Sequence, residues 1–219
     1  MTSSNVSLTY SVREPLDPVE GSPPLVILIH GWGSNEANMM ALADYIDDRF
    51  LVASIRAPIE LGPDSFGWYI LRGEPGRFRH DDAEALAALN IVVHAIEELL
   101  ALYHADPKRV ILMGFSQGAI ISLGVALDRP DKIAGAVLMS GLLLPLFGKN
   151  AGPDRELKGL PILAVHGTWD QMIPVENGRG VRDFLETKPV DLTYREFPMG
   201  HEVSRESLLE IESWLLRRI

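Results

Sequence analysis

The sequence predicts an α/β fold with a mainly parallel central sheet and helices on both faces. Short apolar runs, of a length suited to strands, alternate with segments of helical periodicity almost throughout the chain. Most of these runs are continuous and rich in branched residues, as strands buried on both faces are. Right-handed crossovers between such strands place helices on both faces of a parallel sheet. With no linker or internal repeat, residues 1–219 are expected to form one domain.

The predicted strands begin with an edge strand. Residues Val6–Val12 alternate polar and apolar side chains, as a half-buried strand does. The later runs are more continuously apolar and are expected in the interior of the sheet. They are Leu25–Ile29, Phe50–Ile55, Val110–Met113, Ile133–Ser140, Pro161–Val165 and Leu192–Phe197.

Helices are predicted where apolar residues recur at three- or four-residue steps or follow a strand closely. They are Glu36–Asp48, capped by Ser34 or Asn35; 82–104, the longest; Ala119–Leu127; Val175–Glu186; and Glu206–Leu216. Two long segments, 57–80 and 141–159, are predicted as loops, the first because of its prolines and glycines. Long loops in compact domains are often functional.

Composition excludes several classes of function. A net charge of -10 argues against nucleic acid, because phosphate binding requires clustered Lys and Arg. The absence of cysteine excludes disulfides, thiolate metal sites and a cysteine nucleophile. The histidines lack metal-ligand spacing and no G-x-G-x-x-G follows a strand, so neither a metal nor a nucleotide cofactor is expected. Without a secretory signal or an apolar run of bilayer-spanning length, a cytoplasmic protein is the expectation.

A candidate nucleophile lies between the strand Val110–Met113 and the helix that follows it. The pentapeptide Gly114-Phe115-Ser116-Gln117-Gly118 has the form G-x-S-x-G. In a sharp turn from strand to helix, glycines at both ends avoid collisions and leave the central serine exposed. The alternative is a glycine-rich junction with an incidental serine. The pattern therefore favours Ser116 as a nucleophile if a base, an acid and an oxyanion hole lie nearby.

The base and the acid are sought after Ser116, because this kind of sheet carries them in the order nucleophile, acid, base. A serine hydroxyl needs an adjacent base, and histidine titrates near working pH. His201 follows the last predicted strand and is the best candidate. Asp170 follows the strand Pro161–Val165 and is expected to orient it, although a turn or capping role is the alternative. Asp154 and Asp191 are weaker candidates.

The tetrahedral intermediate of acyl transfer carries an oxyanion that preorganised N–H groups must stabilise. One donor is expected to be the backbone N–H of Gln117, at the start of a helix. The second is assigned to Trp32, in the glycine-rich turn that follows the strand Leu25–Ile29. His30 and His166 also follow strands; we expect a structural hydrogen-bonding role for the first and shaping of the Asp170 loop by the second.

Taken together, these motifs resemble the phospholipase/carboxylesterase family of α/β-hydrolases, which includes acyl-protein thioesterases. The resemblance covers nearly the whole chain and rests on LIHGWG at 28–33, GFSQGA at 114–119, SGLLLP at 140–145, HGTWDQMIP at 166–174 and MGHEVS at 199–204. It implies an α/β-hydrolase fold without a separate cap domain, a Ser116-His201-Asp170 triad and oxyanion donors at Trp32 and Gln117. It also implies hydrolysis of esters or thioesters.

The expected function is that of a serine ester hydrolase acting on small acyl esters or thioesters through a covalent acyl-enzyme. Alternatives are a catalytically silent binding protein on the same fold and a thioesterase or lysophospholipase for long acyl chains. Trp68, Leu144 and Met172 lie in loops expected at the rim and are hypothesised to line the acyl pocket, with ordinary core packing as the alternative. The apolar run 142–147 is compatible with an acyl tunnel or a contact in a homodimer.

Overall fold

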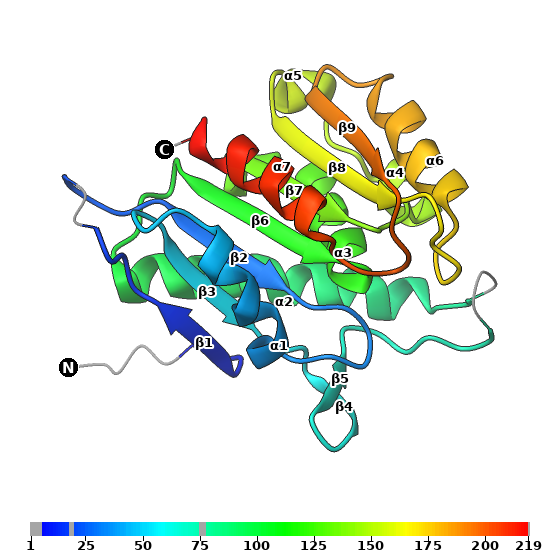
Figure 1. The fold of residues 1–219 in the computed structure, drawn as a ribbon, viewed down its shortest axis with the longest axis horizontal. Helices are drawn as coiled ribbons and strands as arrows, with labels where there is room; N and C mark the ends of the chain where they lie inside the picture. Colours follow the sequence, from blue (N-terminus) through cyan, green and yellow to red (C-terminus); the bar gives the residue numbers. More distant parts are fainter. Residues whose placement is uncertain (1–5, 18–19, 75–77, 219) are drawn as a thin grey trace.

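A computed structural model describes residues 6–17, 20–74 and 78–218, and these form the predicted sheet flanked by helices (Figure 1). The sheet has the strand order β1-β3-β2-β6-β7-β8-β9. Strand β1 is antiparallel to β3 and the other neighbouring pairs are parallel. The strands are β1 Tyr10–Arg13, β2 Leu25–Ile29, β3 Leu51–Ile55, β6 Val110–Phe115, β7 Gly135–Met139, β8 Pro161–Gly167 and β9 Asp191–Phe197. The predicted fold class is confirmed.

The helices divide between the two faces of the sheet. The helical elements are α1 Glu36–Met40, a 3-10 turn Ala41–Tyr45, α2 Asp82–Tyr103, α3 Gln117–Asp128, a 3-10 turn Pro130–Lys132, α4 Pro145–Lys149, α5 Asp154–Leu157, α6 Val175–Leu185 and α7 Arg205–Leu216. Buried residues of α1 and α7 pack on one face, and those of α2, α3 and α6 pack on the other. Figure 1 shows α1 and α7 in front of the sheet, with α2 and α3 behind it.

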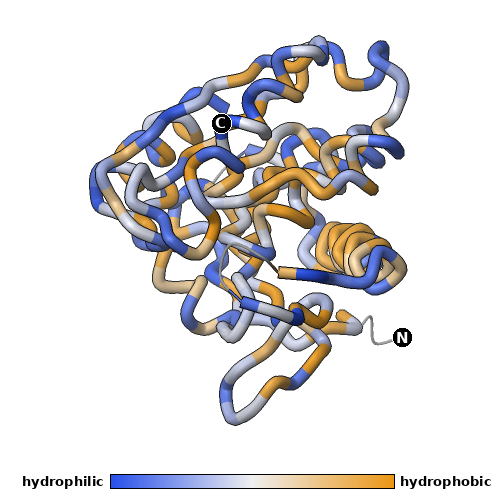
Figure 2. The backbone as a smooth tube through the Cα atoms, turned by 90° about the vertical axis from the view of Figure 1, so that its right-hand side faces the viewer, coloured by the Kyte–Doolittle hydropathy of each residue, from blue (hydrophilic) through white to orange (hydrophobic). Residues whose placement is uncertain are grey.

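Two apolar clusters hold these layers together. Alternate residues of each inner strand enter opposite clusters: in β2, Ile27 and Ile29 face α2 and α3, whereas Val26 and Leu28 face α1 and α7. This explains why the inner strands are apolar throughout, since both of their faces are covered. Figure 2 shows hydrophobic segments concentrated in the interior of the fold and hydrophilic ones at its margins.

The edge strand and the first helix are shorter than predicted. Strand β1 begins at Tyr10, because Ser7 is bonded through its N–H and hydroxyl to the Glu98 carboxylate on α2 and lies off the sheet. The predicted helix Glu36–Asp48 changes to a 3-10 turn after Met40 and ends at Tyr45. Arg13 accounts for this end, since its guanidinium donates to the carbonyls of residues 43, 46 and 47.

Both predicted loops contain regular structure. Within segment 57–80 the antiparallel strands β4 Ile59–Gly62 and β5 Ser65–Gly67 form a hairpin, and residues 75–77 lie outside the described part of the chain. Segment 141–159 contains α4 and α5. These elements are three to five residues long, too short for hydrophobic periodicity to reveal.

Helix α2 corrects a further expectation. By length and composition alone it is long and apolar enough to cross a membrane, whereas no segment of that length was expected. In the fold its apolar side packs on the sheet, with Ala88, Leu89, Val92 and Ile96 buried. Its apolar character is therefore accounted for by its contacts with the sheet and with α3.

The packing of α3 against β2 gives a testable requirement for glycine. A Cβ at Gly118 would overlap the backbone carbonyl of Ile29, which is fixed in the centre of the sheet. We expect Gly118→Ala to lower the free energy of unfolding by about 2 kcal/mol or more, measured by urea denaturation. Gly62→Ala is the matched control, because a Cβ there meets nothing within 4 Å. Equal effects of the two substitutions would contradict this packing.

Candidate active site

The sharp turn after β6 presents Ser116. The serine has φ 54° and ψ -115°, a backbone conformation that L-residues rarely adopt, and α3 begins at the next residue. Its N–H donates to Met139 O on β7 at 2.8 Å and its carbonyl accepts from Ile120 N at 3.1 Å, so the neighbouring strand and helix hold the strained turn. Added side chains at Gly114 or Gly118 would overlap backbone atoms. The predicted elbow geometry is therefore present.

His201 and Asp170 meet Ser116 from two other strand ends. His201 Nε2 lies 2.9 Å from Ser116 Oγ, and His201 Nδ1 lies 2.7 Å from Asp170 Oδ2. An ionised carboxylate only accepts, so Nδ1 carries the proton and Nε2 of the neutral ring accepts from the serine hydroxyl. Residues 85 and 31 positions apart in sequence thus form one hydrogen-bonded chain, because the parallel strands β6, β8 and β9 end at the same edge of the sheet.

The loop after β8 keeps Asp170 ionised and oriented. Its Oδ1 accepts from the N–H groups of Met172 at 2.9 Å and Ile173 at 2.8 Å, which leaves Oδ2 for His201. Burial of the carboxyl raises its pKa, but the hydrogen bonds from His201 and Ile173 outweigh burial and leave the pKa below its usual value. Asp170 is therefore an anion that accepts the hydrogen bond from His201 Nδ1.

His166 forms a hydrogen bond with the loop that carries Asp170. The ring is 1% exposed, and its Nε2 lies 2.8 Å from Ile173 O and 3.5 Å from Asp170 Oδ2. Because a carbonyl only accepts, Nε2 carries the proton. Burial lowers the pKa of His166, although the Ile173 carbonyl and Asp170 oppose this effect. The neutral ring is thus a donor to the loop that carries the acid, as the sequence suggested.

The turn after β2 lies against the elbow. A Cβ at Gly31 would come within 3.1 Å of Ser116 Cβ, so glycine allows the backbone to approach the serine. The N–H groups of Gly33 and Ser34 donate to Phe66 O and Gly31 O, whereas the Trp32 N–H has no acceptor among the described residues. Gln117 begins α3, where N–H groups have no intrahelical partner. Both predicted oxyanion donors thus flank the serine, and their role stays a prediction.

His30, at the end of β2, has the structural role that was expected. It is fully buried, its Nε2 accepts from Ala57 N at 3.0 Å and its Nδ1 donates to Gly31 O at 2.8 Å. Burial lowers its pKa, so the ring is neutral and links the turn after β2 to the end of β3.

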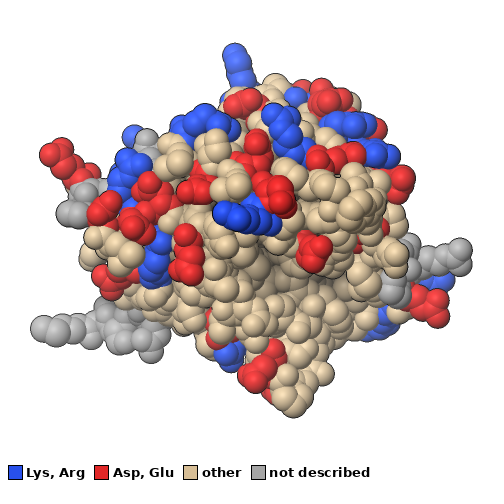
Figure 3. Space-filling model, in the orientation of Figure 1, with Lys and Arg blue, Asp and Glu red and all other residues tan. Residues whose placement is uncertain are grey.

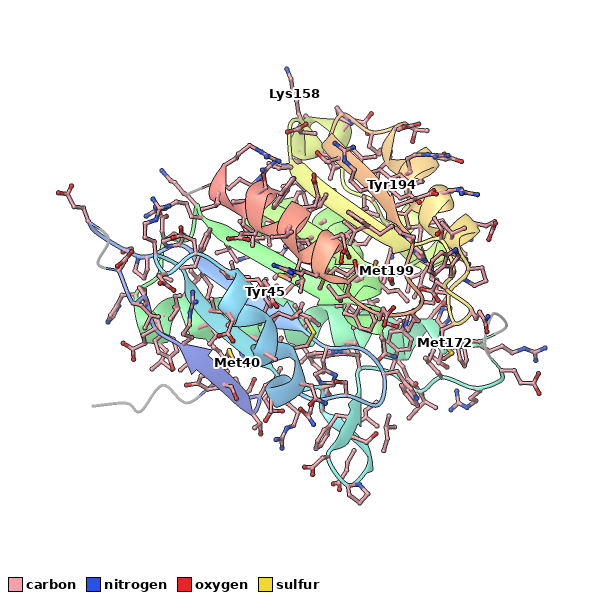
Figure 4. The ribbon with its side chains drawn as sticks, in the orientation of Figure 1. Met40, Tyr45, Lys158, Met172, Tyr194 and Met199 are labelled. Carbon is pink, nitrogen blue, oxygen red and sulfur yellow. The ribbon has the colours of Figure 1, made fainter. Side chains whose placement is uncertain are left out.

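Ser116 opens into a largely apolar cavity of about 600 Å³. Its walls come from the turn after β2, α1, residues 69–71 and 78–80, and the loops after β7 and β8. The apolar lining residues are Trp32, Met39, Leu42, Tyr69, Leu71, Phe78, Phe115, Ile120, Leu142, Leu143, Leu144, Pro145, Met172, Ile173, Pro174 and Val203. Figure 4 labels Met172 on the loop after β8. Figure 3 shows acidic and basic side chains intermingled over the upper part of the molecule and a largely uncharged surface below them.

Of the three residues expected in the acyl pocket, two line the cavity and one does not. Leu144 and Met172 line the cavity, and their contact with substrate stays a prediction. Trp68 does not line it: the side chain is 1% exposed in the core, and its indole Nε1 donates to His30 O at 2.9 Å. Its neighbour Tyr69 lines the cavity instead, and it belongs to the same loop that was expected at the rim.

The fold and this hydrogen-bonded serine, histidine and aspartate define the class as an α/β-hydrolase. The family model for phospholipase/carboxylesterase matches residues 11–218. The chain therefore belongs to the phospholipase/carboxylesterase family, a family of ester-hydrolysing enzymes, and the predicted resemblance is confirmed.

Individual relatives agree with this assignment. The chain is 32% identical over 140 residues to carboxylesterase SOBER1 of Arabidopsis thaliana, an alignment that spans 64% of this chain and 61% of that protein. It is 26% identical over 200 residues to acyl-protein thioesterase 1 of Gibberella zeae, covering 87% and 85% of the two chains. The crystal structure of esterase PE8 has a TM-score of 0.83 at 24% identity, covering 97% of this chain and 99% of that one, and so shares its fold.

The buried His166 predicts a pH dependence of stability. Its folded-state pKa is below the ordinary value of about 6.5, so the unfolded chain binds a proton at higher pH than the folded one does. The contribution of the neutral His166 to the free energy of unfolding is complete above a pH of about 6.5 and is lost as the pH falls below that value. The free energy of unfolding, measured by urea denaturation, should fall less between pH 7 and pH 5 in His166→Gln than in the wild-type protein. His30 acts in the same direction, so part of the slope remains; an unchanged or steeper slope would contradict this.

Proposed function

We propose that this chain is a serine ester hydrolase in which Ser116 is the nucleophile, His201 the general base and acid, and Asp170 the residue that orients the histidine. The observation that supports this most directly is the continuous hydrogen-bonded chain from Asp170 through His201 to Ser116, at the mouth of an apolar cavity. A silent binding protein on the same fold would not require this arrangement, since its strained serine and buried carboxylate cost stability.

Acylation begins when an acyl ester or thioester places its carbonyl carbon beside Ser116 Oγ. The oxygen attacks the carbon as its proton moves to His201 Nε2, and the carbonyl oxygen becomes an oxyanion. The N–H groups of Trp32 and Gln117 donate to that oxygen, with the start of α3 adding a favourable dipole. The intermediate collapses as the bond to the leaving alcohol or thiol breaks, and His201 returns its proton to the departing oxygen or sulfur.

Deacylation repeats these steps with water. His201 Nε2 takes one proton from a water molecule whose oxygen attacks the acyl carbon of the Ser116 ester. The second tetrahedral intermediate breaks its bond to Ser116 Oγ, which regains the proton from His201. The products are a carboxylic acid and the free enzyme, and Asp170 remains ionised throughout because it only stabilises the imidazolium.

The apolar lining of the cavity indicates that the cavity binds the acyl group of the substrate and that this group is apolar. Its lining is mainly aliphatic and aromatic, which suits a small or medium acyl chain of an oxygen ester or a thioester. The relatives named carboxylesterase and acyl-protein thioesterase support both oxygen and sulfur as the leaving atom. A long-chain thioesterase or lysophospholipase is the second candidate, since the cavity volume of about 600 Å³ leaves room beyond an acetyl group.

We further propose that the enzyme acts in the cytoplasm and needs no cofactor.

Kinetics of site variants test the proposed triad. We expect Ser116→Ala, His201→Ala and Asp170→Asn each to lower kcat for a p-nitrophenyl ester by about 10³-fold or more. Ser122→Ala is the matched control, because Ser122 is a buried serine on α3 whose hydroxyl donates to Gly118 O rather than to a residue of the site. Wild-type-like kcat in a folded Ser116→Ala enzyme would contradict the proposal.

The shape of the cavity makes a separate prediction about acyl length. Leu143 is half-buried and lines the cavity, so Leu143→Trp should fill part of its volume. We expect kcat/KM for octanoyl esters to fall by about 10-fold or more relative to acetyl esters, since lost apolar contact is worth roughly 1–3 kcal/mol. A p-nitrophenyl ester series from two to twelve carbons measures this. An unchanged length profile would place the acyl chain elsewhere.

A further inference from the structure

The segment Phe66–Ile70, here called the bridging segment, connects the two sides of the candidate oxyanion hole. Its first contact is with the turn after β2: Phe66 N donates to Ser34 O and Gly33 N donates to Phe66 O, both at 2.9 Å. The Trp68 indole adds a third bond, to His30 O at 2.9 Å. The ring of Trp32 also lies directly against Gly67, where a Cβ would overlap it. The bridging segment and the turn carrying the Trp32 N–H therefore form one bonded unit.

The side chain of Gln117 joins this unit to the nucleophile helix. Its Oε1 accepts from Trp68 N at 2.8 Å and its Nε2 donates to Tyr69 O at 2.8 Å. Gln117 is only 1% exposed, and the two ends of its carboxamide bond the N–H and the C=O of two adjacent residues of the bridging segment. A third anchor lies farther along, where Ile70 N donates to the Glu84 carboxylate on α2 at 2.9 Å.

These bonds are costly to remove. Trp68 and Tyr69 are both 1% exposed, so breaking their bonds to the carboxamide leaves buried N–H and C=O groups without that partner. Each such group costs roughly 1–3 kcal/mol when it stays buried and unpaired. The bridging segment would therefore move to find other partners, and the turn after β2, the Tyr69 wall of the cavity and α3 would no longer be held in one fixed arrangement.

We propose that Gln117 is a positioning residue. Its side-chain carboxamide fixes the turn after β2, and the cavity wall formed by Tyr69, relative to the elbow that carries Ser116. This inference rests on the proposed hydrolase function, because the Trp32 and Gln117 N–H groups are the proposed oxyanion donors. One donor lies on α3 and the other on the turn after β2, and the Gln117 side chain links these two elements through the bridging segment. Preorganised donors are effective only when their spacing is fixed before the reaction. Gln117 thus has two roles: its backbone N–H donates to the substrate oxyanion, and its side chain fixes the positions of the elements that form the site.

Gln117→Met tests this role, since it keeps the length of the side chain and the backbone N–H but removes both carboxamide bonds. We expect kcat to fall by about 10- to 100-fold, with a smaller change in KM, because misplacement by about 1 Å has effects of this size. The values refer to active sites counted by complete labelling with a fluorophosphonate, so a smaller folded fraction does not lower them. The acyl-length profile should also change, because Tyr69 lines the cavity.

Ser122→Ala is the control for this substitution. It also removes a buried hydrogen bond from α3, to Gly118 O, but leaves the bridging segment untouched. It should lower stability while retaining kcat per active site and the length profile. A Gln117→Met enzyme whose kcat and length profile per active site equal those of wild type would overturn the inference. So would an equal loss of kcat in Ser122→Ala.

A second pair of variants keeps the test decisive if Gln117→Met fails to fold. Trp68→Phe retains a buried aromatic ring but removes the bond from the indole to His30 O, and should lower kcat per active site in the same direction. Trp214→Phe is its control, because that buried indole N–H on α7 has no partner among the described residues. Unchanged kcat in Trp68→Phe would overturn the inference. Failure of the folded wild-type enzyme to take up a fluorophosphonate or to hydrolyse any ester of the series would instead refute the proposed function.

Discussion

The approach of the first turn of α3 to the end of β2 is the constraint on which the site depends. Because Gly118 has no side chain, the helix begins directly beside the Ile29 carbonyl, and the parallel pairing of β2 with β6 places Ile29 opposite Gly114. The turn after β2 and the elbow after β6 consequently lie side by side. The strained backbone of Ser116 is part of the same arrangement, since a relaxed turn could not bring the helix so close.

Three histidines at strand ends have different tasks because their surroundings differ. His30 and His166 are buried and held neutral; His30 bonds to backbone through both ring nitrogens, and His166 bonds to Ile173 O through Nε2. His201 is partly exposed beside the cavity and bonds to a carboxylate on one side and to the serine hydroxyl on the other. Burial thus separates the two structural histidines from the one that lies beside the cavity and bonds to the serine.

The order of motifs along the chain predicted much of this site. Ser116, Asp170 and His201 each follow an apolar run, and parallel strands bring the residues after them to one edge. Side-chain bonds to backbone were not predictable in this way. Trp68 was assigned to the pocket because its loop was expected at the rim, yet its indole N–H is satisfied by a carbonyl in the core. Arg13 similarly ends the turn at Tyr45 through carbonyls distant in sequence.

The central claim is that Ser116 is the reactive residue of the cavity, and covalent labelling tests it most directly. The folded wild-type enzyme is treated with a fluorophosphonate, digested, and its modified peptide located by mass spectrometry. A single adduct on Ser116 that is absent from Ser116→Ala is the predicted result. A folded wild-type enzyme that takes up no label, or an adduct on a different serine, would contradict the claim.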